Sequence, residues 1–160
     1  MNIAQLEVKF KAAILRLPPV AGAEVVNFAL DNFRRQGFAG QAWKQRKNPT
    51  AWGQVPRNNG RALLVDKGDL KRSPRVMRHN HEEVVIGSSV PYAKAQNEGF
   101  SGQVVQTVTG FQRKNGSSVK SFSRTINQDI PARPFLANSP VLEERLKRVI
   151  TEHMVRAMHS

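Results

Sequence analysis

The sequence predicts an α+β fold, with amino-terminal helices, a small mostly antiparallel sheet with a long β-hairpin, and a carboxyl-terminal helix. Apolar residues recur at helical spacing at both ends of the chain. Between them lie short runs of alternating, β-branched residues, two of which flank an Asn-Gly pair. Helices at both ends of a strand-rich middle are typical of an α+β domain. We expect residues 1–20 to form an amino-terminal helical arm and residues 21–160 to form a single α+β domain.

Two helices are expected in the first part of the chain. Apolar side chains recur at intervals of three and four residues at Ile3, Leu6, Phe10, Ile14 and Leu17. This spacing predicts a helix over residues 2–17 that ends at Pro18-Pro19. Val26, Leu30 and Phe33 share one face of a second helix over residues 21–36, which Gly37 ends.

The middle of the chain is expected to form strands. Short strands are predicted over residues 62–65 and 83–86. The segments 104–111 and 119–126 flank Asn115-Gly116, which is a strong signal for a tight turn, so we expect a β-hairpin with a basic tip. Residues 37–60 contain both tryptophans, Trp43 and Trp52, without periodicity, and predict a long basic loop.

The last helix has a clear predicted start. Ser139 can cap it, and Pro140 suits its first position because no intrahelical N–H is needed there. The apolar stripe continues to about Ala157, which predicts a helix over residues 140–157.

Charge is the strongest feature of the composition. The 160 residues carry 25 Lys and Arg against 12 Asp and Glu, a formal net charge of +13, and no cysteine. Such a chain attracts polyanions at low salt. Without cysteine there is no disulfide, Cys-zinc site or thiol nucleophile. The amino terminus intersperses charge with apolar residues, so we expect neither a secretory signal nor contact with a membrane.

Catalytic and metal-binding patterns are weak. There is no Gly-x-Ser-x-Gly elbow and no phosphate-binding loop. His79 and His81 would share one face of a strand and could offer two metal ligands, as a metal-dependent nuclease would need, but no suitable further ligand accompanies them. Glu143 and Glu144 are adjacent on a helix and point about 100° apart, so they cannot flank one substrate atom. The sequence predicts no enzyme, no metal site and no cofactor.

Non-specific binding of nucleic acid is the alternative function. Basic residues with interleaved tryptophans suit contact with phosphates and stacking on bases. The residues expected to face DNA are Lys44, Arg46, Lys47, Arg57, Arg61, Arg113 and Lys114. The competing interpretation is a solvated basic face whose tryptophans anchor the loop on the core.

The segment Ile130–Phe135, here called the strap, has an unusual backbone. Pro131 and Pro134 hold φ near −65° on both sides of Arg133, so the segment is expected to be extended and stiff. It should deliver Phe135 to a core and Arg133 to a fixed position, where the guanidinium could bind a carboxylate through two hydrogen bonds.

Three landmarks occur in order along the chain: Gln36-Gly37 with Trp43, the segment from Val84 to Gly99 that contains Tyr92-Ala93, and the strap. Together they resemble the phage virion morphogenesis family, the tail-completion proteins of Mu-like phages, from Phe33 to the end of the chain. Gln96 departs from the family pattern, which commonly has a histidine there. The segment Asp66–Ser73 also departs from the family's small-residue turn.

The resemblance implies a structural, non-enzymatic protein of the virion, assembled in the bacterial host cytoplasm. It would act in tail completion or head–tail joining through contacts with other tail, neck or connector proteins, and a homo-oligomeric ring is a further expectation. The basic loop or hairpin would face the DNA passing through. The residues assigned to assembly or to the fold are Tyr92, Ala93, Gly99, Ile130, Pro131, Arg133, Pro134 and Phe135. Whether Arg133 serves an interface or the fold stays open at this point.

Overall fold

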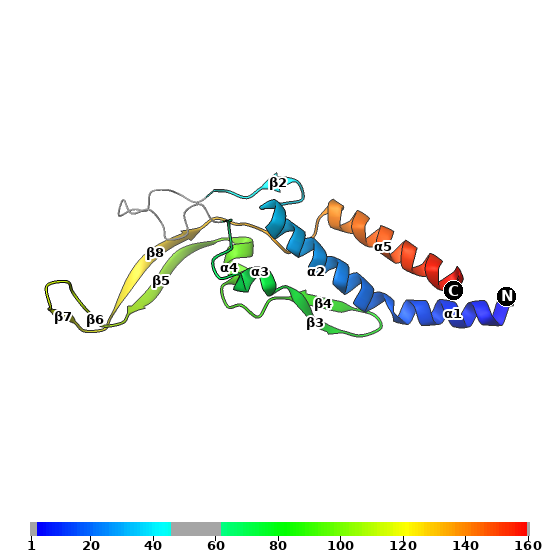
Figure 1. Cartoon of the computed structure of the whole chain (residues 1–160), viewed down its shortest axis with the longest axis horizontal. Helices are drawn as coiled ribbons and strands as arrows, with labels where there is room; N and C mark the ends of the chain where they lie inside the picture. The colour runs from blue at the N-terminus through cyan, green and yellow to red at the C-terminus, as the bar shows by residue number, and fades with distance from the viewer. Residues whose placement is uncertain (1–2, 46–61, 160) are drawn as a thin grey trace.

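The computed structural model describes residues 3–45 and 62–159 as an elongated α+β molecule (Figure 1). The helices are α1 (Ile3–Leu15), α2 (Leu17–Arg35), α3 (Asp69–Arg72), α4 (Ala93–Glu98) and α5 (Pro140–His159). The strands are β1 (Gly37–Phe38), β2 (Gln41–Ala42), β3 (Arg75–His79), β4 (Val84–Gly87), β5 (Phe100–Val108), β6 (Phe111–Gln112), β7 (Ser118–Val119) and β8 (Phe122–Ile130). They pair antiparallel as β1–β2, β3–β4, β5–β8 and β6–β7. The predicted fold class is confirmed.

The first two helices follow each other almost without a break. The prediction that Pro18-Pro19 ends the first helix is wrong: α1 ends at Leu15, and α2 begins at Leu17 instead of residue 21. Both prolines lie in the first turn of α2, where a missing N–H costs no hydrogen bond. Residue 20 therefore lies inside α2, and the division into an arm and a domain stays a prediction.

An ion-pair cluster joins α2 to α5. Arg145 on α5 donates from Nε to Glu24 Oε1 at 2.5 Å and from Nη1 to Asp31 Oδ2 at 2.9 Å. Its guanidinium carbon also lies 5.5 Å from the ring centroid of Phe28. At the start of α5, the Leu142 amide donates to Ser139 Oγ at 3.2 Å, so the predicted cap is present. The helix extends two residues beyond its predicted end.

The core lies where α2, α4 and the strap meet. Its buried side chains are Phe33, Trp43, Leu63, Leu70, Ala93 and Phe135. The Phe33 ring packs edge-on against Trp43 at 5.6 Å and lies 5.0 Å from the ring of Phe135. Trp43 anchors its segment here, at the described edge of the predicted loop.

The predicted strand over residues 62–65 is wrong. The segment forms a turn in which Leu64 adopts φ 58° and Leu63 is buried. The Gln36 side chain takes the place of a neighbouring strand: its Oε1 accepts from the Leu63 amide, and its Nε2 donates to the carbonyl of Phe33 at 2.6 Å. A short apolar run does not distinguish a strand from a buried turn.

The hairpin β3–β4 contains the predicted strand at 83–86, observed as β4, and a partner that the sequence did not indicate. Asn80 closes its turn by accepting at Oδ1 from the amides of Glu82 and Glu83, both at 2.8 Å. The expectation that His79 and His81 share a strand face is wrong, because His79 ends β3 and His81 lies in the turn.

The long predicted hairpin is confirmed as the ribbon β5–β8 with the tip pair β6–β7 (Figure 1). Its register runs from Phe100↔Ile130 to Val108↔Phe122, so the ribbon extends further toward the body than predicted. At the tip, the Arg113 amide donates to the Ser117 carbonyl at 2.8 Å. Gly116 has φ 83°, which the Asn-Gly signal anticipates.

Taken singly, each described helix is too short or too polar to cross a membrane; α1 and α2 pass that test of length and composition only as a pair, bent by 40°.

Candidate functional site

The two segments that carry the sequence resemblance meet in space. Helix α4 follows Tyr92, and the strap crosses its carboxyl-terminal end before the chain enters α5. The Arg133 amide donates to the Gln96 carbonyl at 2.9 Å, which ties the strap to the last turn of α4. Residues distant in sequence thus form one unit.

Asn97 provides most of this connection. Its Oδ1 accepts from the amides of Phe135 at 2.9 Å and Leu136 at 3.0 Å, and its Nδ2 donates to the Leu136 carbonyl at 3.0 Å. One side chain therefore replaces the backbone partners that an extended segment would find in a sheet. Sequence reasoning missed Asn97. The available signal was an asparagine in a short helix, two residues before a glycine.

Gly99 lets the strap approach. Its φ is 84°, a conformation that residues with a Cβ rarely adopt. A Cβ there would lie 2.9 Å from the Ala132 nitrogen and 3.0 Å from the Ile130 carbonyl oxygen. The glycine is thus required both by its backbone angle and by the closeness of the strap.

Donors from α2 and from the segment after β2 hold the opposite side of the strap. Asn32 Nδ2 donates to the Phe135 carbonyl at 3.2 Å, and Trp43 Nε1 donates to the Pro134 carbonyl at 2.8 Å. Both donors belong to buried residues. The carbonyls of the last two residues of the strap therefore each receive a side-chain donor.

Phe135 and Arg133, the two side chains that the strap was expected to position, are both buried. Phe135 is buried in the core. Arg133 is only 8% exposed, and its guanidinium donates from Nε to the Lys44 carbonyl at 2.8 Å and from Nη2 to the Gln45 carbonyl at 3.5 Å. Two successive backbone carbonyls thus accept from its guanidinium, and the anticipated bond to a carboxylate stays a prediction.

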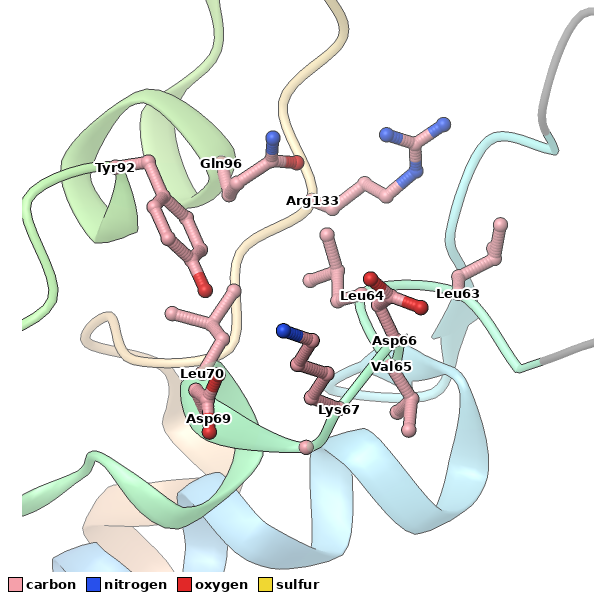
Figure 2. A pocket seen from close by; sticks show the side chains of 11 residues that line it. Leu63, Leu64, Val65, Asp66, Lys67, Asp69, Leu70, Tyr92, Gln96 and Arg133 are labelled. Carbon is pink, nitrogen blue, oxygen red and sulfur yellow. The ribbon is translucent and has the colours of Figure 1, made fainter. Parts of the chain in front are cut away.

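A cavity of about 540 Å³ opens beside this junction (Figure 2). Tyr92, Gln96 and Arg133 line it together with the segment from Leu63 to Leu70. Tyr92 is 48% exposed, and Figure 2 shows its ring reaching toward Leu70. Sequence reasoning identified Tyr92 and Arg133 but did not place the segment 63–70 opposite them, because that segment carries no motif.

The cavity is lined by hydrogen-bonding and charged groups together with apolar side chains. The Tyr92 hydroxyl and the Lys67 amine face it in Figure 2, and Gln96, Asp66 and Asp69 are also among the residues that line it. Within residues 3–45 and 62–159, no group of three or more His, Cys, Asp or Glu side chains is arranged to hold a metal ion. The arrangement suits binding of a peptide segment through hydrogen bonds and apolar contacts.

The residues expected to face DNA do not gather on one described surface. Lys44 is exposed next to the strap, whereas Arg113 and Lys114 are exposed at the ribbon tip, far along the molecule (Figure 1). Arg46, Lys47, Arg57, Arg61 and the second tryptophan, Trp52, lie outside the described residues.

The chain matches a known protein family. A family model described as the phage virion morphogenesis family matches residues 10–155, which includes α2, the α4 junction, the ribbon, the strap and most of α5. No curated protein matches the chain. No solved structure matches it either.

Proposed function

Because this chain belongs to the phage virion morphogenesis family over residues 10–155, we propose that it acts in tail completion or head–tail joining. The family itself supports the coarser statement that the protein is a structural component of phage morphogenesis and acts in virion assembly. The family match carries the proposal. Its finer part is that the protein works through contacts with other tail, neck or connector proteins.

The geometry is consistent with a protein that works by contact. The strap junction ties α2, α4 and the start of α5 together through Asn32, Trp43 and Asn97. From this body the ribbon extends to one side and α1 to the other (Figure 1). A rigid centre with two projecting elements can hold two neighbours at a defined separation, as a joint requires.

Complementation in the phage tests the proposal. The gene is deleted from the phage genome, and the wild-type chain is supplied from a plasmid. We expect the deletion to yield DNA-filled heads and separate tails by negative-stain microscopy, with joined infectious particles restored by the plasmid. Complete infectious particles without the protein, or a block before heads or tails form, would refute a role at this step.

A second candidate function has one observation in its favour. The outer part of the ribbon carries four basic residues and no acidic residue between Val108 and Gln128: Arg113, Lys114, Lys120 and Arg124. Such a tip can contact phosphates without reading sequence. We infer that any nucleic acid bound by the described residues contacts the tip, and the salt experiment in the Discussion tests this.

A further inference from the structure

The ribbon β5–β8 has one apolar and one polar face. In its register the pairs Phe100↔Ile130, Val104↔Ile126 and Val108↔Phe122 lie on the same side, because alternate residues of a strand face the same way. We call these six side chains the ribbon face. The other side carries mainly polar residues, among them Ser101, Gln103, Thr107, Ser123, Thr125, Asn127 and Asp129.

Within the described chain the ribbon face is only partly covered: Val104, Val108, Ile126 and Ile130 are half-buried, and both phenylalanines are exposed. Phe100 and Phe122 are 38% and 44% exposed. Among the described elements, β5 and β8 pack extensively only on each other. A two-stranded ribbon is marginally stable in water and normally needs a further strand or a helix against its apolar side. The ribbon face is therefore a surface that requires a partner.

Helix α1 also has an exposed apolar side. Ile3, Leu6, Phe10 and Ile14 lie along one side of it, here called the helix stripe, and each is exposed. The one buried residue of α1 is Ala13, beside His153 of α5, whose Nε2 lies 3.2 Å from the Ala13 carbonyl oxygen. A helix of 13 residues is marginal without packing of its apolar side.

The two surfaces match in kind and in length. Nine-residue strands extend about 30 Å, and a 13-residue helix extends about 20 Å, so the helix stripe fits along the ribbon face. Within one molecule they cannot meet, because the ribbon and α1 project from opposite ends (Figure 1). We propose that the ribbon face of one copy packs on the helix stripe of a second copy.

Charge favours this head-to-tail contact over ribbon against ribbon. Arg124, which donates to Gln106 Oε1 at 2.9 Å, lies on the same side of the ribbon as the apolar pairs. Two ribbon faces pressed together would bring two Arg124 side chains into one apolar interface and would leave both helix stripes uncovered. Glu7 flanks the helix stripe with a side chain 62% exposed, where it pairs with Lys11 Nζ at 2.6 Å, and its carboxylate can accept from Arg124 as a second cation.

Head-to-tail contact has a consequence for assembly. Each copy uses two different surfaces, so association continues beyond a dimer and gives a ring where the rotation closes or a filament where it does not. This inference concerns the purified protein alone and goes beyond the proposed function. Failure of complementation and failure of self-association are therefore separate results.

Two double variants of the full chain test the contact, each with a control on the opposite side of the same element. The ribbon variant carries Phe122→Thr and Ile126→Thr, with Val105→Thr, on the polar side and 72% exposed, as its control. The helix variant carries Leu6→Gln and Phe10→Gln, with Val8→Gln, 67% exposed, as its control. Threonine and glutamine keep strand and helix propensity, and circular dichroism checks folding.

Sedimentation velocity over a range of concentrations measures association. We expect the wild type and both controls to form species larger than a dimer, and each double variant to weaken self-association by about tenfold or more. Mixed in equal amounts, the two double variants should form a one-to-one dimer and nothing larger, because each retains the surface that the other lacks.

Four results would each overturn the proposal. These are a wild type that stays monomeric, a helix variant that still associates alone, controls weakened as much as the double variants, and a mixture of the two double variants that stays monomeric.

Discussion

Gly99 shows how one residue can determine whether two distant segments meet. Its positive φ directs the chain from α4 into β5, and its missing side chain leaves room for the strap at Ala132. Gly116 has nearly the same φ, 83°, but nothing lies within 4 Å of the position that a Cβ would occupy. Gly99 therefore combines a positive φ with a ψ of 167°, a region essentially restricted to glycine, and with a close contact that Gly116 lacks.

We predict that Gly99→Ala destabilises the protein much more than Gly116→Ala. Both substitutions incur the strain of a positive φ, about 1 kcal/mol, and Gly99→Ala incurs more because its ψ of 167° lies in a region essentially restricted to glycine. Gly99→Ala also forces the backbone of the strap away from residue 99. The free energy of unfolding should therefore fall by about 3 kcal/mol or more in this variant. The free energy of unfolding from urea titration measures both. Equal losses in the two variants would mean that the strap moves aside freely.

Arg133 is held by the fold through the carbonyls of Lys44 and Gln45. A buried guanidinium with such acceptors stabilises the molecule that contains it, which favours the fold over the interface as the role of this side chain. The side chain also lines the cavity beside Tyr92, so it can support the shape of that surface.

We predict that Arg133→Ala lowers the free energy of unfolding by about 2–3 kcal/mol, because charged hydrogen bonds to two carbonyls are lost. Arg133→Lys keeps the charge but not the planar fork, and should recover only part of the loss. Thermal and urea unfolding measure stability, and particle yield in the complementation assay measures function. Wild-type stability together with blocked assembly would instead assign Arg133 to an interface.

At the scale of elements, α2 and α5 are joined by the Arg145 cluster. Hydrogen bonding from Arg145, opposed by partial burial and supported by Arg34, holds the pKa of the Asp31 carboxyl below its usual range. A lowered carboxyl pKa stabilises the fold at a pH above that of the unfolded carboxyl. This stabilisation is lost as the pH falls from about 4 through the lower pKa of the folded state.

We predict that Asp31→Asn reduces stability at neutral pH by about 1 kcal/mol and flattens the loss of stability below about pH 4. Asp69→Asn is the matched control. Asp69 pairs with Arg72 within α3, and its side chain is 58% exposed, so this pair should contribute little to stability. Urea titrations at several pH values between neutral and acidic compare the three proteins. An unchanged acid slope in Asp31→Asn would contradict the assignment.

Local sequence signals predicted some elements well and others poorly. The Asn-Gly tip and the Ser139-Pro140 start were predicted correctly because each depends on a few adjacent residues. Pro18-Pro19 was misread because proline disrupts a helix interior but suits a first turn, and the residues alone allow both. The strand predicted at residues 62–65 failed because the Gln36 side chain, distant in sequence, satisfies that backbone instead.

At the scale of the whole molecule, the chain carries a net charge of +13, and its basic ribbon tip projects from one end (Figure 1). When a protein binds DNA and releases counterions, the logarithm of its affinity falls linearly with the logarithm of the salt concentration. The slope is proportional to the number of phosphates contacted. If the tip contacts DNA, removing its basic residues should reduce the salt dependence of the affinity by a predictable amount.

We predict that Arg113→Gln with Lys114→Gln reduces the slope of log affinity against log salt by about 1.8 for duplex DNA, which corresponds to two phosphate contacts. Arg148→Gln with Arg156→Gln removes the same charge from α5, toward the other end of the molecule, and should change the slope much less. Fluorescence anisotropy at several salt concentrations measures it. Equal changes in both variants would indicate a general charge effect without a site at the tip.

The sequence by itself determined the α+β class, the stiff strap that ends in a core phenylalanine, the ribbon with its tight turn, and the resemblance that the family match bears out. These follow from residue type and short-range spacing. Only the tertiary structure decided that Asn97 and Gly99 dock the strap and that Arg133 binds carbonyls. It also decided that the helix stripe and the two phenylalanines of the ribbon face are exposed at opposite ends of the molecule (Figure 1). The physical reason is that docking and exposure depend on which distant segments meet, and short-range spacing does not encode those meetings.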